Sequence, residues 1–76
     1  MTIEEEVKTA IENAIPGSTA MVTGGGGHFE IEVTSKAFEG KRILEKQRLV
    51  YSAITHLMAG DTAPVHAVDR MVCKTE

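Results

Sequence analysis

The stretch from residue 35 to 51, SKAFEGKRILEKQRLVY, constrains the fold more than any other part of the chain. Its opening residues, Phe38-Glu39-Gly40, are typical of a short turn that fixes an aromatic side chain. A helix is predicted from near Lys41 to about Ala59, where Gly60 ends it. Its later apolar residues recur at helical spacing: Leu49, Val50, Ala53, Ile54, Leu57 and Met58. One side of this helix must therefore pack on a core.

The same stretch carries the concentrated positive charge of a chain whose net charge is −3. Five of the eight Lys and Arg residues lie in it: Lys36, Lys41, Arg42, Lys46 and Arg48. Glu45 is at helical spacing from several of them, so we expect it to neutralise part of this charge. Clustered cations bind phosphates or acidic surfaces, which makes Lys41, Arg42, Lys46 and Arg48 the candidate partner-binding or nucleic-acid-binding residues. The alternative is a solvated helix face.

The composition indicates one small soluble domain spanning residues 1–76. A single cysteine, Cys73, excludes an internal disulfide and favours a reducing compartment. We find no apolar run of membrane-spanning length, and the N-terminus is acidic where a targeting peptide would be basic. These features predict a protein of the cytoplasm, or of an organelle matrix after processing, without a membrane partner.

The first part of the chain predicts a helix and a short strand. Thr2 and Glu5 fit a capping box, and the helix is expected to run from Thr2 to Ile15. A strand is predicted at residues 18–23. The four glycines at residues 24–27 are expected to form a mobile hairpin connection longer than the tightest turns. A strand follows them, not the helix that a phosphate loop requires, which argues against phosphate binding.

Residues 28–34 alternate cleanly and predict a strand with one wet face. His28, Glu30, Glu32 and Thr34 share that face, where the two glutamates are expected to be solvated and not catalytic.

The last strand is predicted at residues 65–72. Alternation places Val65, Ala67 and Met71 on one face of it and His66, Val68, Arg70 and Val72 on the other. The tail from Cys73 to Glu76 is expected to fray.

The predicted order is α-β-β-α-β, an α/β (α+β) chain. We expect a two-layer sandwich in which both helices cover one face of a three-stranded mixed sheet.

Four segments, in the right order, resemble the BolA family. They are His28-Phe29-Glu30-Ile31, Ser35-Lys36-Ala37-Phe38-Glu39-Gly40, Arg48-Leu49-Val50-Tyr51 and Val65-His66-Ala67-Val68. The resemblance implies a fold similar to the type II KH domain without its GXXG loop. The glycine run is not that loop, because it joins two strands.

The resemblance also implies a function in iron–sulfur cluster trafficking or in iron and redox sensing. Members of the family pair with monothiol glutaredoxins and share a [2Fe–2S] cluster. The glutaredoxin and its glutathione supply thiolates, and a histidine of the last strand supplies an imidazole. His66 matches that histidine, so it is the expected cluster ligand. The isolated chain is expected to carry no cofactor and to be a monomer.

The second ligand is left open by the resemblance. Family members often supply it from the loop between the first two strands, which here contains glycine alone. His28 is the nearest candidate; water or glutathione, or a complex without a cluster, are the alternatives. Cys73 stands at the far end of the last strand from His66, so a straight strand keeps the two apart.

Some BolA-like proteins bind DNA as transcriptional regulators, and this is the competing function. It would use the same basic helix. We expect no enzymatic activity and assign no catalytic residue, because the sequence shows no nucleophile with a base in reach.

Overall fold

The computed structural model describes residues 2–60 and 63–75. Its elements are α1 (Ile3–Ala14), β1 (Thr19–Gly25), β2 (His28–Thr34), the short 3-10 helix η1 (Lys36–Phe38), α2 (Ile43–Met58) and β3 (Ala67–Lys74). Apart from η1, this is the predicted α-β-β-α-β order. None of the helices in the described ranges combines the length and hydropathy needed to cross a bilayer.

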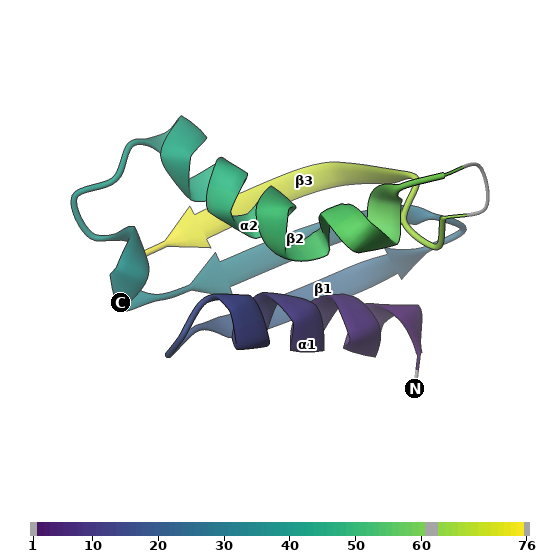
Figure 1. Cartoon of the computed structure of the whole chain (residues 1–76), viewed down its shortest axis with the longest axis horizontal. Helices are drawn as coiled ribbons and strands as arrows, with labels where there is room; N and C mark the ends of the chain where they lie inside the picture. The colour runs from purple at the N-terminus through teal and green to yellow at the C-terminus, as the bar shows by residue number, and fades with distance from the viewer. Residues whose placement is uncertain (1, 61–62, 76) are drawn as a thin grey trace.

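Both helices lie on one face of a three-stranded sheet, as predicted (Figure 1). The strand order is β1-β2-β3. β1 and β2 form an antiparallel hairpin, whereas β3 runs parallel to β2 after the crossover through α2. The sheet is therefore mixed, with a helical layer on one side and an open face on the other.

The core lies between these two layers and is almost entirely aliphatic. Its buried members are Val7, Ile11, Ile15, Ala20, Phe29, Ile31, Val33, Phe38, Val50, Ala53, Ile54 and Val65. Phe38 is completely buried, which explains why the chain forms η1 before α2. The Ala37 N–H donates to the Ser35 hydroxyl at 3.0 Å and fixes the first turn of η1.

Capping sets where each helix begins. The Thr2 hydroxyl accepts the Glu5 N–H at 3.2 Å, as the capping box predicts. α2 begins at Ile43, later than predicted, because the Arg42 N–H donates to Glu45 Oε1 at 3.1 Å. Glu45 thus caps the helix, and none of the ion pairs found in residues 2–60 and 63–75 joins it to the neighbouring cations.

The prediction of a long connection at the glycine run was wrong. Gly24 and Gly25 belong to β1 and pair with Phe29 and His28. The turn itself is Gly26-Gly27, with φ angles of 63° and 85°. Two consecutive residues in the left-handed region make the tight hairpin turn that glycine adopts without strain.

The predicted faces of the last strand were right for Val65 and Met71, which both pack toward the core, but wrong for Val68. β3 begins at Ala67, and its register against β2 shifts by one residue, so that Phe29 pairs with Val68 but Glu30 pairs with Arg70. The extra residue, Asp69, reverses the alternation. Val68, Met71 and Cys73 consequently pack toward the core.

The prediction that the tail frays from Cys73 was wrong for Cys73 and Lys74, because both residues belong to β3. Glu76 lies outside the described residues.

Candidate functional site

His66 lies immediately before β3 and is fixed by its backbone to the glycine turn. The N–H groups of His66 and Ala67 both donate to the Gly27 carbonyl oxygen, at 2.8 Å and 3.0 Å. On the other side, the Val65 N–H donates to the Leu57 carbonyl oxygen at 3.1 Å, and the Val65 side chain is completely buried. The backbone of His66 is therefore held between the end of α2 and the hairpin.

The His66 side chain is exposed, and its ring packs on Gly27. A Cβ added at Gly27 would lie 2.1 Å from His66 Cδ2, so no side chain fits beneath the ring. In the structure Gly27 makes room for His66, which holds the imidazole at the surface and outside the core.

His28 comes to the same end of the sheet from the neighbouring strand. It is the first residue of β2, and its Cα partner on β3 is Ala67, next to His66. His28 Nδ1 lies 3.2 Å from Asp69 Oδ1, and both side chains are exposed. When Nδ1 carries the proton toward that carboxylate, Nε2 is left free to bind a metal.

Cys73 lies at the opposite end of β3, as predicted. It pairs with Val33 and packs half-buried against the core. The seven residue steps from His66 to Cys73 span about 20 Å or more along an extended chain. Burial raises the pKa of the Cys73 thiol, an effect that Lys46 partly opposes.

No group of three or more His, Cys, Asp and Glu side chains is arranged to hold a metal within the part of the chain that the structure describes.

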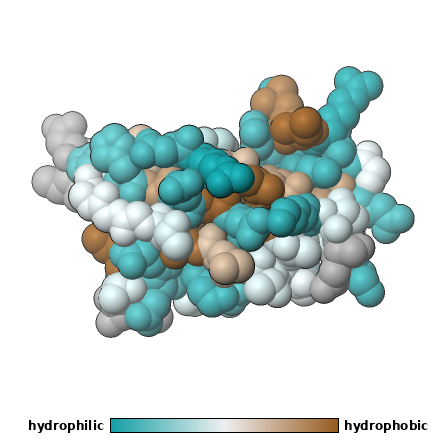
Figure 2. All heavy atoms as spheres, turned by 180° about the vertical axis from the view of Figure 1, so that it is seen from behind, coloured by the Kyte–Doolittle hydropathy of each residue, from teal (hydrophilic) through white to brown (hydrophobic). Residues whose placement is uncertain are grey.

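The acidic residues of the open sheet face are paired with cations across the strands. Lys74 Nζ lies 2.7 Å from Glu32 Oε1, and Arg70 lies 4.0 Å from Glu30. Lys74 holds the pKa of Glu32 below its ordinary value by hydrogen bonding and charge. Figure 2 shows hydrophilic side chains spread over this face, with hydrophobic ones between them. The predicted solvated face is confirmed.

The four basic residues proposed for partner binding differ from Arg70 and Lys74, because they do not pair with the glutamates of the sheet. Lys41, Arg42 and Arg48 are exposed, and Lys46 is half-buried. The ion pairs of residues 2–60 and 63–75 use Lys8, Arg70 and Lys74 but none of these four. Their charge therefore remains available to an external anion.

These cations begin at the end of the molecule away from His66. α2 runs antiparallel to β3: Lys46 influences Cys73 near the end of β3, whereas Leu57 contacts Val65 before its start. The 16 residues of α2 span about 24 Å. The basic residues thus extend from the start of α2 toward its middle, whereas His66 directly follows Val65, which is bonded to Leu57 near the other end of the helix. Figure 1 shows α2 lying along the sheet beside β3.

Two large aliphatic side chains accompany the cations. Ile43 is 74% exposed and Leu44 is 57% exposed. A shallow groove beside them is lined by Lys41, Glu45, Arg48, Leu49 and Ser52. The start of α2 therefore combines exposed apolar surface with positive charge that takes part in none of the ion pairs of the described residues.

Comparison with known proteins gives consistent matches. The profile of the family described as BolA-like protein matches residues 3–76. BolA-like protein 1 of Bos taurus is 33% identical over 87% of this chain and 54% of its own length. The chain thus spans about half the length of the mammalian relatives that it matches.

Solved structures give the same result. A BolA protein homologue from Coxiella burnetii is 32% identical, with a TM-score of 0.77 over 97% of this chain and 92% of that one. Yeast Fra2 is 32% identical, with a TM-score of 0.72 over 99% of this chain and 81% of that one.

Proposed function

This chain belongs to the BolA-like family, and from that premise we propose that it is a non-enzymatic accessory protein that binds a monothiol glutaredoxin and shares a [2Fe–2S] cluster with it. The observation that carries the proposal is the exposed His66 ring, seated on Gly27 and held by backbone hydrogen bonds on both sides. The cluster is cargo that the partner brings, and its remaining ligands come from the glutaredoxin and its glutathione.

The geometry of His66 suits a ligand to a cluster carried by another protein. Its backbone is fixed by Gly27 and Leu57, so little backbone entropy is lost when the ring binds. Its side chain is exposed and can reach metal outside the chain. Imidazole replaces thiolate on one iron in other mixed clusters and raises their reduction potential.

We propose His28 as the second ligand from this chain. The Cα register places it beside the residue that follows His66, at the same end of the sheet. Asp69 lies within hydrogen-bond distance of its Nδ1, which orients the ring and leaves Nε2 as the metal-binding atom.

A non-enzymatic role is supported by the surroundings of the histidines. Among the side-chain hydrogen bonds of the described residues, the one made by a histidine joins His28 to Asp69. An imidazole paired with a carboxylate lacks the third member, a hydroxyl or thiol nucleophile, that acyl transfer requires.

We propose that the glutaredoxin docks along the side of the molecule formed by α2 and β3. Contact with both His66 and the cations at the start of α2 requires a partner that spans about 24 Å. A folded protein of about 100 residues has a radius of gyration of about 13 Å, which is large enough. The cations would then contact acidic residues of that partner.

The test is to mix the chain with cluster-loaded monothiol glutaredoxin under anaerobic conditions and record visible absorption and circular dichroism. The wild type should change both spectra. His66→Ala should abolish the change, whereas His56→Ala, which removes an exposed histidine from the end of α2, should not. Spectra and complex lifetime that are the same for His66→Ala and wild type would refute the ligand assignment.

A DNA-binding regulator is the second candidate, and it is favoured by the cations around the start of α2, which form no ion pair within residues 2–60 and 63–75. Binding to a duplex should weaken steeply with salt. Neutralising Lys41 and Arg42 together should lower the slope of log K against log salt by about 2. Absence of binding to any duplex at low salt would exclude this function.

A further inference from the structure

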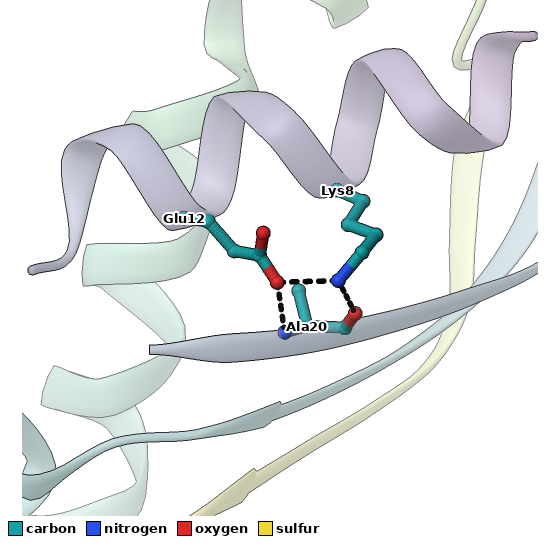
Figure 3. Close-up of polar contacts among 3 residues, drawn as sticks. All are labelled: Lys8, Glu12 and Ala20. Atoms are coloured by element: carbon teal, nitrogen blue, oxygen red, sulfur yellow. Dashed lines mark hydrogen bonds and ion pairs between the residues drawn. The ribbon is translucent and has the colours of Figure 1, made fainter. Parts of the chain in front are cut away.

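The outer edge of β1 is held by two side chains of α1 (Figure 3). The Lys8 ammonium donates to the Ala20 carbonyl oxygen at 2.9 Å, and the Ala20 N–H donates to Glu12 Oε2 at 3.0 Å. Lys8 and Glu12 are one helical turn apart and form an ion pair with each other. We term this three-way contact the α1 clamp.

The groups of Ala20 that the α1 clamp binds are those that a neighbouring strand would use. β1 stands at the end of the sheet order, with β2 on one side. Successive residues of a strand direct their N–H and C=O groups to alternate sides, so Ala20, Val22 and Gly24 share the outer side. Gly24 has a φ of 133°, outside the strand region. Ala20 and Val22 are left as the regular outward positions, and the clamp occupies one of them.

Burial and charge both hold the α1 clamp in place. The Ala20 side chain is buried in the core, so this part of β1 cannot turn away from α1. The Ala20 N–H and the Lys8 ammonium together hold the pKa of Glu12 below its ordinary value. The carboxylate therefore stays ionised, and remains an acceptor without a proton, under more acidic conditions than an ordinary glutamate does.

We propose that the outer edge of β1 is a strand-pairing surface for a second copy of this chain, which the α1 clamp keeps closed. Open strand edges pair readily with identical edges, and an antiparallel pair about a two-fold axis closes at two copies. Met21 lies between the two outward positions and is 62% exposed on the open face. Such pairing would bring it against the second copy and bury apolar surface. The clamp is the physical basis that we propose for the monomeric state predicted from the sequence.

The test compares the self-association of two charge-neutral double variants by sedimentation equilibrium. Lys8→Ala/Glu12→Ala should tighten the dimer dissociation constant by about tenfold or more relative to wild type. Lys36→Ala/Glu39→Ala removes the same charges from the exposed turn around η1 and should not change it. Adding Val22→Pro to the clamp variant should restore the monomer, because proline removes the outward N–H.

A folded clamp variant that stays monomeric would overturn the inference. A dimer that persists after Val22→Pro would overturn it as well, because it would not use this edge.

A measurement on the wild type keeps the inference testable if the variants fail to fold. Amide hydrogen exchange should be at least about tenfold slower at Ala20 than at Val22, because only the Ala20 N–H has a clamp acceptor. Equal exchange rates at these two edge positions would show that the clamp does not close in solution. Neither experiment contains a glutaredoxin or a cluster, so both outcomes are independent of the proposed function.

Discussion

The two ends of α2 carry the two candidate binding regions, and these regions are built in different ways. The end at His66 is assembled from the glycine turn with the adjacent first residue of β2, and from the residue before β3, which comes much later in the sequence. The region at the start of α2 takes its cations and exposed aliphatic residues from one continuous stretch. The first depends on strand register and turn geometry, whereas the second depends on the helix alone.

Because the two regions are built differently, they should be sensitive to different mutations. Small changes in the backbone at the hairpin turn should disturb the His66 region, although no ligand residue is replaced. The basic region should respond to the loss of its own charges and to little else. Each prediction below tests one side of this contrast.

The largest effect is expected for Gly27→Ala. Gly27 has a φ of 85°, which strains an alanine. The new Cβ would also lie 2.1 Å from His66 Cδ2, so the imidazole ring must move away from residue 27. Gly26→Ala has the same backbone strain, with φ 63°, but nothing within 4 Å of its Cβ. We expect Gly26→Ala to lower the free energy of unfolding by about 1 kcal/mol. Gly27→Ala should lower it by a further ~1–3 kcal/mol.

Urea denaturation measures this difference, and the spectra of the glutaredoxin mixture report its effect on His66. We expect Gly27→Ala to impair the spectral change and Gly26→Ala to preserve it. Identical stability and spectra for the two alanine variants would show that the ring does not rest on Gly27 in solution.

The second prediction concerns Asp69→Asn, which keeps the shape of the side chain but removes its charge. If Asp69 orients His28 as a ligand, cluster retention in the complex should fall by about tenfold, the lower range for loss of a carboxylate behind a ligating histidine. The lifetime of the cluster absorption measures retention. Glu30→Gln, which removes a carboxylate of the same open face, is the matched control. Equal cluster lifetimes for Asp69→Asn and Glu30→Gln would contradict the proposal that His28, oriented by Asp69, is the second ligand.

The third prediction is that the two regions act independently. His66→Ala should impair cluster sharing, and Lys41→Ala/Arg42→Ala should weaken the affinity of the complex. Because about 24 Å of helix separates these sites, their effects on binding free energy should add to within about 0.5 kcal/mol in the combined variant. Anaerobic calorimetric titration with cluster-loaded glutaredoxin measures both effects on the binding free energy. Strong coupling would mean that the partner joins the two regions into one rigid interface.

The smallest effect is expected at Cys73. Burial raises the pKa of its thiol, so the thiolate fraction near neutral pH is lower than in an unfolded chain. Alkylation by iodoacetamide should therefore be slower in the native protein than in urea, and it should accelerate as the pH rises toward the raised pKa. Equal rates in both states would show that the end of β3 is open in solution.

Sequence patterns determined the features of this protein that depend on local spacing. The capping box of α1, the helix period of α2 and the alternation of β2 each act within a few residues. The element order follows from them, and so does the concentration of cations on α2. The four segments that resemble the BolA family likewise single out His66, whose role as a cluster ligand stays a prediction.

Only the tertiary structure decided how distant residues meet. The extra residue at Asp69 reverses the faces of β3, and it arises from pairing with β2, which no local pattern reveals. The seat of His66 on Gly27 needs a turn and a strand to be brought together by backbone hydrogen bonds. The clamp of Lys8 and Glu12 on Ala20 likewise joins a helix to a strand edge. These contacts depend on three-dimensional register, because the free energy of each is gained only after the chain has folded back on itself.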